Sequence, residues 1–468
     1  MLVIKIFSKR KKVFRERKKC EKIRAKRTWS LVPRASNTNV VDCKWVYNLK
    51  RDKNGAIICY KARFVAKGFR QQPGIDFHET FSPVVKLTTI RAVLSLAVTN
   101  NWPLSQLNVQ NAFLYGNLKE QASRAWFERL SKALFDLGFK GSKTDPSLFI
   151  YSRGHTLLYI MVYVDDIIVI GTNKGTIDNI NCQLGSAFAL KDLGPLNYFL
   201  GIEIVPYVSN ILLSQKKYIL ELLQWAGLSN CNHVSSPMVT LSSLSLDDNI
   251  AFSNPVKYRQ VVGSLQYVTL SWPNIALLST RYVNICMLRP RIISLKLNGF
   301  YVIFMKGNLD TFLEAFSDAG WPGDLNDLQS TRGFAIYLGS NLMSWATCKQ
   351  RTILRSFTNS KYKTLADTVA ELTWLQALLY ELGIRSSSTP ILWCNNIGAT
   401  YLSANPIFCV YTKHMEIDYH FVREKVAQGD LQVQHISTHD QIIDIFTKPL
   451  PTPRFLFLRS KLQVVTRP

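Results

Sequence analysis

Residues 157–171 read LLYIMVYVDDIIVIG, two apolar runs on either side of adjacent carboxylates, Asp165 and Asp166. Each run has the length and β-branched composition of a strand, so the stretch predicts a β-hairpin with both acids at its tip. Adjacent carboxylates repel each other and do not stabilise an apolar hairpin, whereas hard divalent cations such as Mg²⁺ bind closely spaced oxygen ligands. The pair indicates either a solvated turn or a metal site, and the rest of the chain decides between them.

The 468-residue chain is strongly basic, with 57 Lys and Arg against 32 Asp and Glu and a formal net charge of +25. Residues 1–27 contain thirteen Lys and Arg and two Glu, a net +11, so the remaining residues carry +14. A field of this sign attracts phosphate backbones or anionic membranes, and we favour nucleic acid. The run at 1–27 fits a nuclear-localisation or RNA-binding tail as well as an accidental leader.

Composition narrows the class of protein further. A hydrophobic content of 47% gives room for two or three domains with real cores. The nine Cys are dispersed, with no C-x-x-C pair, which fits free thiols in a reducing compartment. Charge breaks every long apolar run, so we expect no membrane span and no membrane partner.

Periodicity predicts a chain of mixed strands and helices. We expect strands at 41–47, 60–68, 106–116 (running into a turn), 198–205, 211–213, 333–338, 342–345, 391–394 and 431–436, with one more ending at 316–321. We expect helices at 87–98, 122–137, 215–226, 364–382 and 419–427, and throughout 256–310 with a break at SWPNI, 271–275. Residues 235–254 are polar and fit a linker. The final strands and helices alternate and predict a separate, smaller α/β domain.

Thirteen motifs occur in one order along residues 28–465: TWSLVPR, CKWVY, YKARFVAKGF, ETFSPVVK, WPLSQLNVQNAFLYG, RAWF, YVDD, KDLGPLNYFLGIEI, YRQVVGSLQYVTL, GFAIYLG, AELTWLQ, TKHMEIDYHFVRE and HDQIIDIFTKPL. This series resembles the reverse transcriptase–ribonuclease H region of copia-type retrotransposon Pol polyproteins. The resemblance implies an α+β right-hand polymerase of fingers, palm and thumb, followed by an α/β ribonuclease H-like domain. It implies fingers and palm at 28–234, thumb or connection at 235–310, the ribonuclease H-like domain at 311–445 and a tail at 446–468, with the basic leader 1–27 outside it.

The resemblance also implies a polymerase site. Two Mg²⁺ ions held by three palm aspartates activate the primer 3′-hydroxyl and support the leaving pyrophosphate. Asp165 and Asp166 match two of the three, and Asn108 stands where the family has the third. Phe113 matches an aromatic gate against the ribose 2′-hydroxyl, with ordinary core packing as the alternative. Lys61 and Arg63 resemble nucleotide-binding finger cations that face the triphosphate.

In the ribonuclease H-like domain the family uses four carboxylates to bind two metal ions. Asp318 matches the first. We place the lost second acid at Asn359 and the lost third at Asn395, and Lys361 adds a positive charge nearby. Either Glu416 or Asp418 could supply the fourth; the sequence positions implied for this site are Asp318, Asn359, Asn395, Glu416 and Asp418.

These departures predict a catalytically inactive copy, because an amide lacks the charge that makes a carboxylate a hard-cation ligand. The chain is also shorter than the family near residue 121 and before Phe316. Alternatives are a non-catalytic nucleic-acid-binding remnant and an unexpressed or unstable relic. The expected partners are an RNA template, a DNA primer, an RNA–DNA hybrid and deoxynucleotides. Family inference places the protein in cytoplasmic virus-like particles, with the nucleus as an end-point.

Overall fold

The computed structural model describes residues 43–51, 57–66, 82–109, 122–207, 210–227, 233–234, 236–237, 255–284, 296–297, 301–307, 310–320, 329–353, 356–386, 388–405, 416–462 and 464–466. The chain forms two compact units. The first contains the described parts of 1–83 and 109–137, and the second those of 84–108 and 138–468.

The described residues of the first unit form an antiparallel hairpin and one helix. Strands β1 (Cys43–Arg51) and β2 (Ile57–Ala66) pair along their whole length, which confirms the predicted hairpin. Helix α3 (Ala122–Asp136) is amphipathic, with Trp126, Leu130 and Leu134 buried at four-residue spacing. The helix predicted at 122–137 is therefore present.

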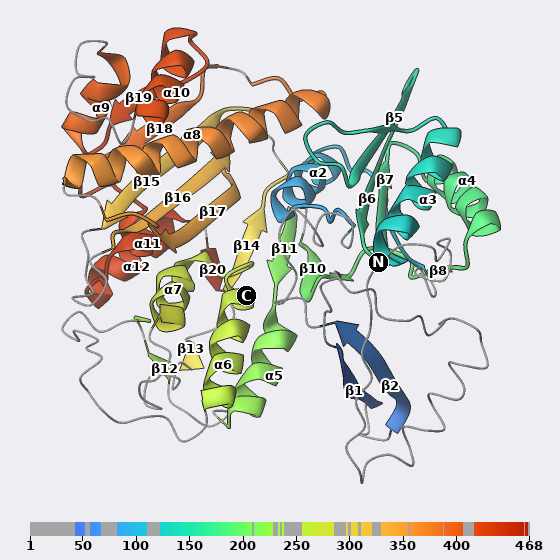
Figure 1. Ribbon diagram of the computed structural model, residues 1–468. Coiled ribbons are helices and arrows are strands. Elements are labelled where there is room, and N and C mark those ends of the chain that lie inside the picture. Colours follow the sequence, from blue (N-terminus) through green and yellow to red (C-terminus); the bar gives the residue numbers. More distant parts are fainter. Residues whose placement is uncertain are drawn as a thin grey trace, which may run out of the picture. The chain divides into compact units, whose positions relative to one another are not determined.

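The quoted stretch forms the centre of a six-stranded sheet in the second unit. Its strands lie in the order β4-β5-β6-β7-β3-β8, and Figure 1 shows β6 and β7 as neighbours within it. Their apolar side chains alternate between two faces; Tyr159 and Met161 share a core with α2, whereas α4 packs against β7. The bounds are β3 Leu104–Val109, β4 Lys140–Gly141, β5 Leu148–Arg153, β6 Thr156–Tyr163, β7 Asp166–Gly171, β8 Leu190–Asp192, α2 Leu87–Thr99 and α4 Lys174–Ala187.

A second sheet in this unit has the order β20-β14-β11-β10-β9. It corrects the expectation that 256–310 is helical throughout, because Tyr301–Met305 forms strand β14. This YVIFM run is β-branched and aromatic, and it pairs with β11 on one side and β20 on the other. Residues predicted as a tail thus complete a sheet. The bounds are β9 Tyr198–Phe199, β10 Ile202–Tyr207, β11 Asn210–Ser214, β20 Val464–Thr466, α5 Lys216–Ala226, α6 Pro255–Val268, a 3₁₀ turn at Pro273–Ile275 and α7 Ala276–Asn284; β12 (His233–Val234) pairs with β13 (Lys296–Leu297).

The C-terminal half contains the predicted α/β domain, with strand order β17-β16-β15-β18-β19. The first three strands are antiparallel, and β15, β18 and β19 are parallel. The bounds are β15 Leu313–Gly320, β16 Thr331–Leu338, β17 Asn341–Lys349, β18 Ile391–Cys394, β19 Gln432–His435, α8 Phe357–Glu381, α9 Ile397–Ala404, α10 Glu416–Ala427, α11 Asp444–Thr447 and α12 Thr452–Lys461.

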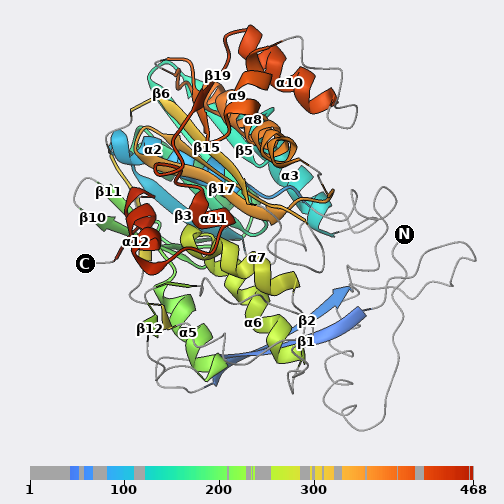
Figure 2. The same cartoon turned by 90° about the vertical axis from the view of Figure 1, so that its left-hand side faces the viewer.

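Helices cover both faces of this sheet, as Figures 1 and 2 show. Ala315, Ile336 and Met343 point into a core shared with α8, and their chain neighbours Phe316 and Tyr337 point into a core shared with α11 and α12. This period-two alternation explains why these strands are buried on both sides. No helix among the described residues is long and apolar enough to cross a membrane.

Candidate active site

The polymerase-type site lies where β3, β6 and β7 meet. Antiparallel pairing sets Asp166 opposite Tyr163 on one side and opposite Asn108 on the other. Val164 and Asp165 therefore form a two-residue turn, and Val164 adopts a φ of 57°. The register brings Asn108, Asp165 and Asp166 together, as predicted from the sequence.

The Asn108 side chain is joined to the acids by its amide N–H groups. Its Nδ2 donates to Asp166 Oδ1 at 2.9 Å and lies 3.4 Å from the backbone carbonyl of Asp165. Burial, and to a lesser extent the charge of Asp165, raises the pKa of the Asp166 carboxyl, and the Asn108 hydrogen bond offsets part of that rise. Two carboxylates with one amide donor thus stand where the resemblance implies three carboxylates.

Two further polymerase candidates lie in the first unit. Lys61 and Arg63 are on β2, where they pair in register with Asn48 and Val46 of β1. Phe113 lies outside the described residues, so the gate assignment stays a prediction.

The ribonuclease H-like site is built around Asp318, near the C-terminal end of β15. Its carboxylate is buried; Thr447 Oγ1 donates to Oδ2 at 2.9 Å, and the ammonium of Lys448 lies 3.2 Å from the same oxygen. The ammonium of Lys361 lies 2.8 Å from Oδ1. Burial raises the pKa of Asp318, but the charges of the two lysines outweigh burial and hold that pKa below its usual range.

Asn395 joins the same cluster. It directly follows β18, which runs parallel to β15, so the two strands bring Asn395 and Asp318 to the same edge of the sheet. Lys361 Nζ donates to Asn395 Oδ1. The Lys361 ammonium thus contacts both the Asp318 carboxylate and the Asn395 amide.

The structure corrects our placement of the second acid at Asn359. Asn359 and Lys361 both lie on α8, but side chains two residues apart on a helix point in directions that differ by about 200°. Lys361 faces the sheet and is buried, whereas Asn359 is half-buried and forms no hydrogen bond or ion pair with the Asp318 cluster among the described residues. Lys361 therefore occupies the position at which we expected an acid to meet Asp318.

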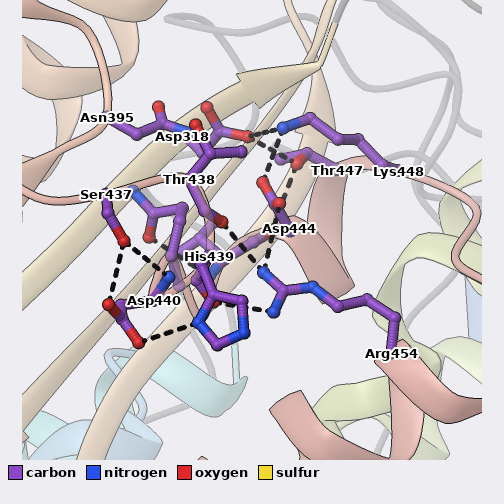
Figure 3. Close-up of polar contacts among 12 residues, drawn as sticks. Asp318, Asn395, Ser437, Thr438, His439, Asp440, Asp444, Thr447, Lys448 and Arg454 are labelled. Atoms are coloured by element: carbon purple, nitrogen blue, oxygen red, sulfur yellow. Dashed lines mark hydrogen bonds and ion pairs between the residues drawn. The ribbon is translucent and has the colours of Figure 1, made fainter.

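The fourth acid is also corrected. Glu416 is exposed at the start of α10, and Asp418 forms an ion pair with Lys363 at 2.7 Å, so neither belongs to the cluster. The carboxylate that lies beside Asp318 is Asp444, at the start of α11, and the ammonium of Lys448 contacts both acids (Figure 3). Burial, and the charge of Asp318, raise the pKa of Asp444, although Lys448 opposes them.

Asp444 lies within HDQIIDIFTKPL, a motif in which the sequence predicts no metal ligand. The spacing of Asp444, Thr447 and Lys448 within one helical turn was the available signal, because residues three and four apart share a helix face. Next to them, Arg454 donates hydrogen bonds to the backbone carbonyls of Thr438 and His439 and so stabilises the loop that contains these two residues (Figure 3).

Comparison with known proteins agrees with this architecture. The sequence model of the family described as reverse transcriptase (RNA-dependent DNA polymerase) matches residues 26–121 and 118–240. The chain is 40% identical over 481 residues to the retrovirus-related Pol polyprotein from transposon RE1 of Arabidopsis thaliana, across 94% of this chain and 33% of that protein. The chain belongs to the reverse transcriptase family of copia-type Pol polyproteins.

Other relatives support the same family. The Pol polyprotein from transposon TNT 1-94 of Nicotiana tabacum is 30% identical over 488 residues, across 93% of this chain and 36% of that protein. This reverse transcriptase-family chain therefore spans about a third of the length of the curated relatives it matches. A solved foamy viral protease-reverse transcriptase in complex with RNA/DNA hybrid is similar at a TM-score of 0.47 and 12% identity, across 92% of this chain and 54% of that one. The family model covers the part of the chain that forms the six-stranded sheet, and a five-stranded α/β domain follows it.

Proposed function

We propose that this chain is an RNA-directed DNA polymerase region by descent that has lost its catalytic activity. The observation that carries the proposal is the hydrogen bond from the Asn108 amide to Asp166 Oδ1. An active site of this family would require a third carboxylate at position 108. Asn108 instead donates a hydrogen bond to the Asp166 carboxylate. The proposed loss extends to ribonuclease H, because Asn395 and Lys361 stand beside Asp318.

The residues of the polymerase site do not fit a pair of Mg²⁺ ions. Such ions require closely spaced, negatively charged oxygens, and here two carboxylates remain while the third position is neutral. The amide N–H also engages Asp166 Oδ1, an oxygen that a metal would need. Removing one charge from a metal site typically costs several kcal/mol of transition-state stabilisation. Among the described residues, no group of three or more His, Cys, Asp or Glu could hold a metal ion.

Primer extension on an RNA template with deoxynucleotides and Mg²⁺ tests this proposal. We expect no incorporation by the chain and restored incorporation by Asn108→Asp, which replaces the amide donor with a third carboxylate. Asn108→Ala is the matched control, because it removes the donor without adding the charge. Incorporation by the unmodified chain would contradict the loss of activity. If neither the unmodified chain nor either variant incorporates deoxynucleotides, the change at residue 108 is not the sole defect.

A second candidate function is nucleic-acid binding without catalysis, which the net charge of +25 favours. A labelled RNA–DNA hybrid, or a DNA primer on an RNA template, should bind with an affinity that falls steeply from 50 to 300 mM KCl, because binding releases counterions. Lys61→Ala/Arg63→Ala should make the salt slope shallower by about one for each phosphate contact removed. Salt-independent binding would contradict this candidate. If the chain shows no cooperative unfolding, the third alternative, an unstable relic, would be favoured. We also propose that the protein is located in cytoplasmic virus-like particles and in the nucleus.

A further inference from the structure

The Lys361 ammonium is enclosed by the groups that surround it. Only 3% of its side chain is exposed, and its partner Asp318 has a fully buried side chain. Asn395 Oδ1 accepts a hydrogen bond from Nζ, and the Phe357 ring lies 4.5 Å from the same nitrogen. A carboxylate, an amide oxygen and a ring face are all electron-rich, so each favours a cation at this point.

The charges in this cluster balance without a metal ion. Asp318 and Asp444 each contribute one negative charge, and Lys361 and Lys448 each contribute one positive charge. Lys448 lies 2.6 Å from Asp444 and 3.2 Å from Asp318, so it bridges the two acids. Arg454 adds a further positive charge 3.8 Å from Asp444. The cluster therefore has no net negative charge with which to attract a divalent cation.

The residues of this site do not fit the metal ions that the family implies. A metal ion ligated by Asp318 and Asn395 would lie where the Lys361 ammonium lies, and two cations cannot share that volume. Displacing the ammonium would leave the buried positive charge of Lys361 without its carboxylate partner, which is strongly unfavourable. Lys361 thus excludes a divalent metal ion from this position, both sterically and through its positive charge.

We propose that the Lys361 ammonium is a tethered substitute for the divalent cation of the ribonuclease H-like domain. It neutralises Asp318 permanently, so the domain folds without metal and does not bind it. The inference goes beyond the proposed loss of polymerase activity and does not depend on it. It assigns a structural role to a residue that stands where we expected an acid to meet Asp318.

The first test compares stability without metal. Urea unfolding of the full chain in EDTA is measured for Lys361→Met and for Lys363→Met, a matched control two residues along α8. Lys363 forms its ion pair with Asp418 at 2.7 Å, but its side chain is 34% exposed, so water can replace that partner. We expect Lys361→Met to lower the urea midpoint at least about threefold more than Lys363→Met, because the Asp318 side chain is fully buried and water cannot replace the ammonium beside its Oδ1.

The second test measures Mn²⁺ binding by electron paramagnetic resonance, in a D165N/D166N background that removes the polymerase-site carboxylates. We expect no bound Mn²⁺ in this background alone. Adding Lys361→Glu/Asn395→Asp supplies two acids beside Asp318, and this variant should bind Mn²⁺ with an affinity at least about tenfold above the upper limit measured for the background. The same change should make the urea midpoint rise when Mn²⁺ is added.

Two results would overturn the inference. One is Mn²⁺ binding by the D165N/D166N background that Lys361→Met leaves unchanged, since the ammonium would then not occupy the metal position. The other is equal midpoint losses for Lys361→Met and Lys363→Met. If the Lys361→Glu/Asn395→Asp chain does not fold, these two measurements still decide the question. Because neither readout is enzyme activity, a failure here is distinct from a failure of the primer-extension proposal.

Discussion

An asparagine side chain differs from an aspartate side chain by one charge and by two hydrogen-bond donors, and both differences matter at residue 108. The donors reach Asp166 Oδ1, which stabilises the ionised carboxylate. The missing charge spares Asp166 a second negative neighbour besides Asp165. The amide therefore relieves repulsion in a chain without metal while it removes a ligand that a metal would require.

Asn108→Asp should make stability depend more strongly on pH. Burial already raises the folded-state pKa of Asp166, so its contribution to stability is greatest below the unfolded value near 3.9 and is lost as pH rises through the folded value. A third acid raises that pKa further. We expect Asn108→Asp to reduce the free energy of unfolding in EDTA more at pH 8 than at pH 5. Urea titrations at both pH values measure this, with Asn108→Ala as control; equal losses at both pH values would contradict the argument.

At the scale of the element, the hairpin tip holds a β-branched residue in an unfavourable backbone conformation. Val164 has a φ of 57°, a region that suits Gly, Asn or Asp in a two-residue turn. The flanking strands impose this conformation, because Tyr163 pairs with Asp166 and leaves two residues to reverse the chain. The turn therefore presents both acids at a cost to local stability.

Substitutions at residue 164 test the turn. Gly normally destabilises a protein by about 0.5–1 kcal/mol relative to Ala, because it is more flexible when unfolded. At a positive φ the order should reverse, so we expect Val164→Gly to be at least as stable as Val164→Ala in urea unfolding. Both variants lose the Val side chain, which makes the comparison a matched one. A normal Ala-over-Gly difference would show that the turn does not hold this conformation.

At the scale of the second unit, the polymerase sheet and the ribonuclease H-like sheet share buried polar contacts. Arg91 of α2 donates to the carbonyl of Met343 on β17 at 2.9 Å and to that of Leu270 at 2.8 Å, and its guanidinium lies 3.8 Å from the Trp345 ring. Tyr159 Oη of β6 also donates to the Leu382 carbonyl beyond α8. These bonds join segments more than 170 residues apart, so the two sheets should unfold together.

Arg91→Met tests that coupling. It leaves two carbonyls without their charged donor, and we expect a loss of about 2–4 kcal/mol in the free energy of unfolding. Arg91→Lys should not restore it, because one ammonium cannot reproduce the planar fork. Arg124→Met is the control, since Arg124 forms an exposed pair with Glu128 and should change stability by less than about 0.5 kcal/mol. Urea unfolding followed by tryptophan fluorescence and circular dichroism should give one coincident transition; two separate transitions would contradict the coupling.

The sequence by itself determined most of the local structure, and its resemblance to copia-type proteins led to the proposed loss of activity. The two apolar, β-branched runs around Asp165 and Asp166 predict the hairpin, because each run has the length and composition of a strand. The amides at Asn108 and Asn395 can be read directly as missing charges. The strand at 301–305 was missed because its five residues do not distinguish a strand from a buried helix; its pairing with β11 and β20 decided it.

Only the tertiary structure decided which side chains meet at Asp318. The rotation of α8 turns Lys361 toward the sheet and Asn359 away from it, and that rotation depends on packing along the whole helix. The return of the chain after β19 brings Asp444 beside Asp318, 126 residues earlier, while Asp418 pairs with Lys363. Contacts at such separations are set by how strands and helices pack, not by local preference, so the sequence identified Asp318 but only the fold placed Asp444 beside it.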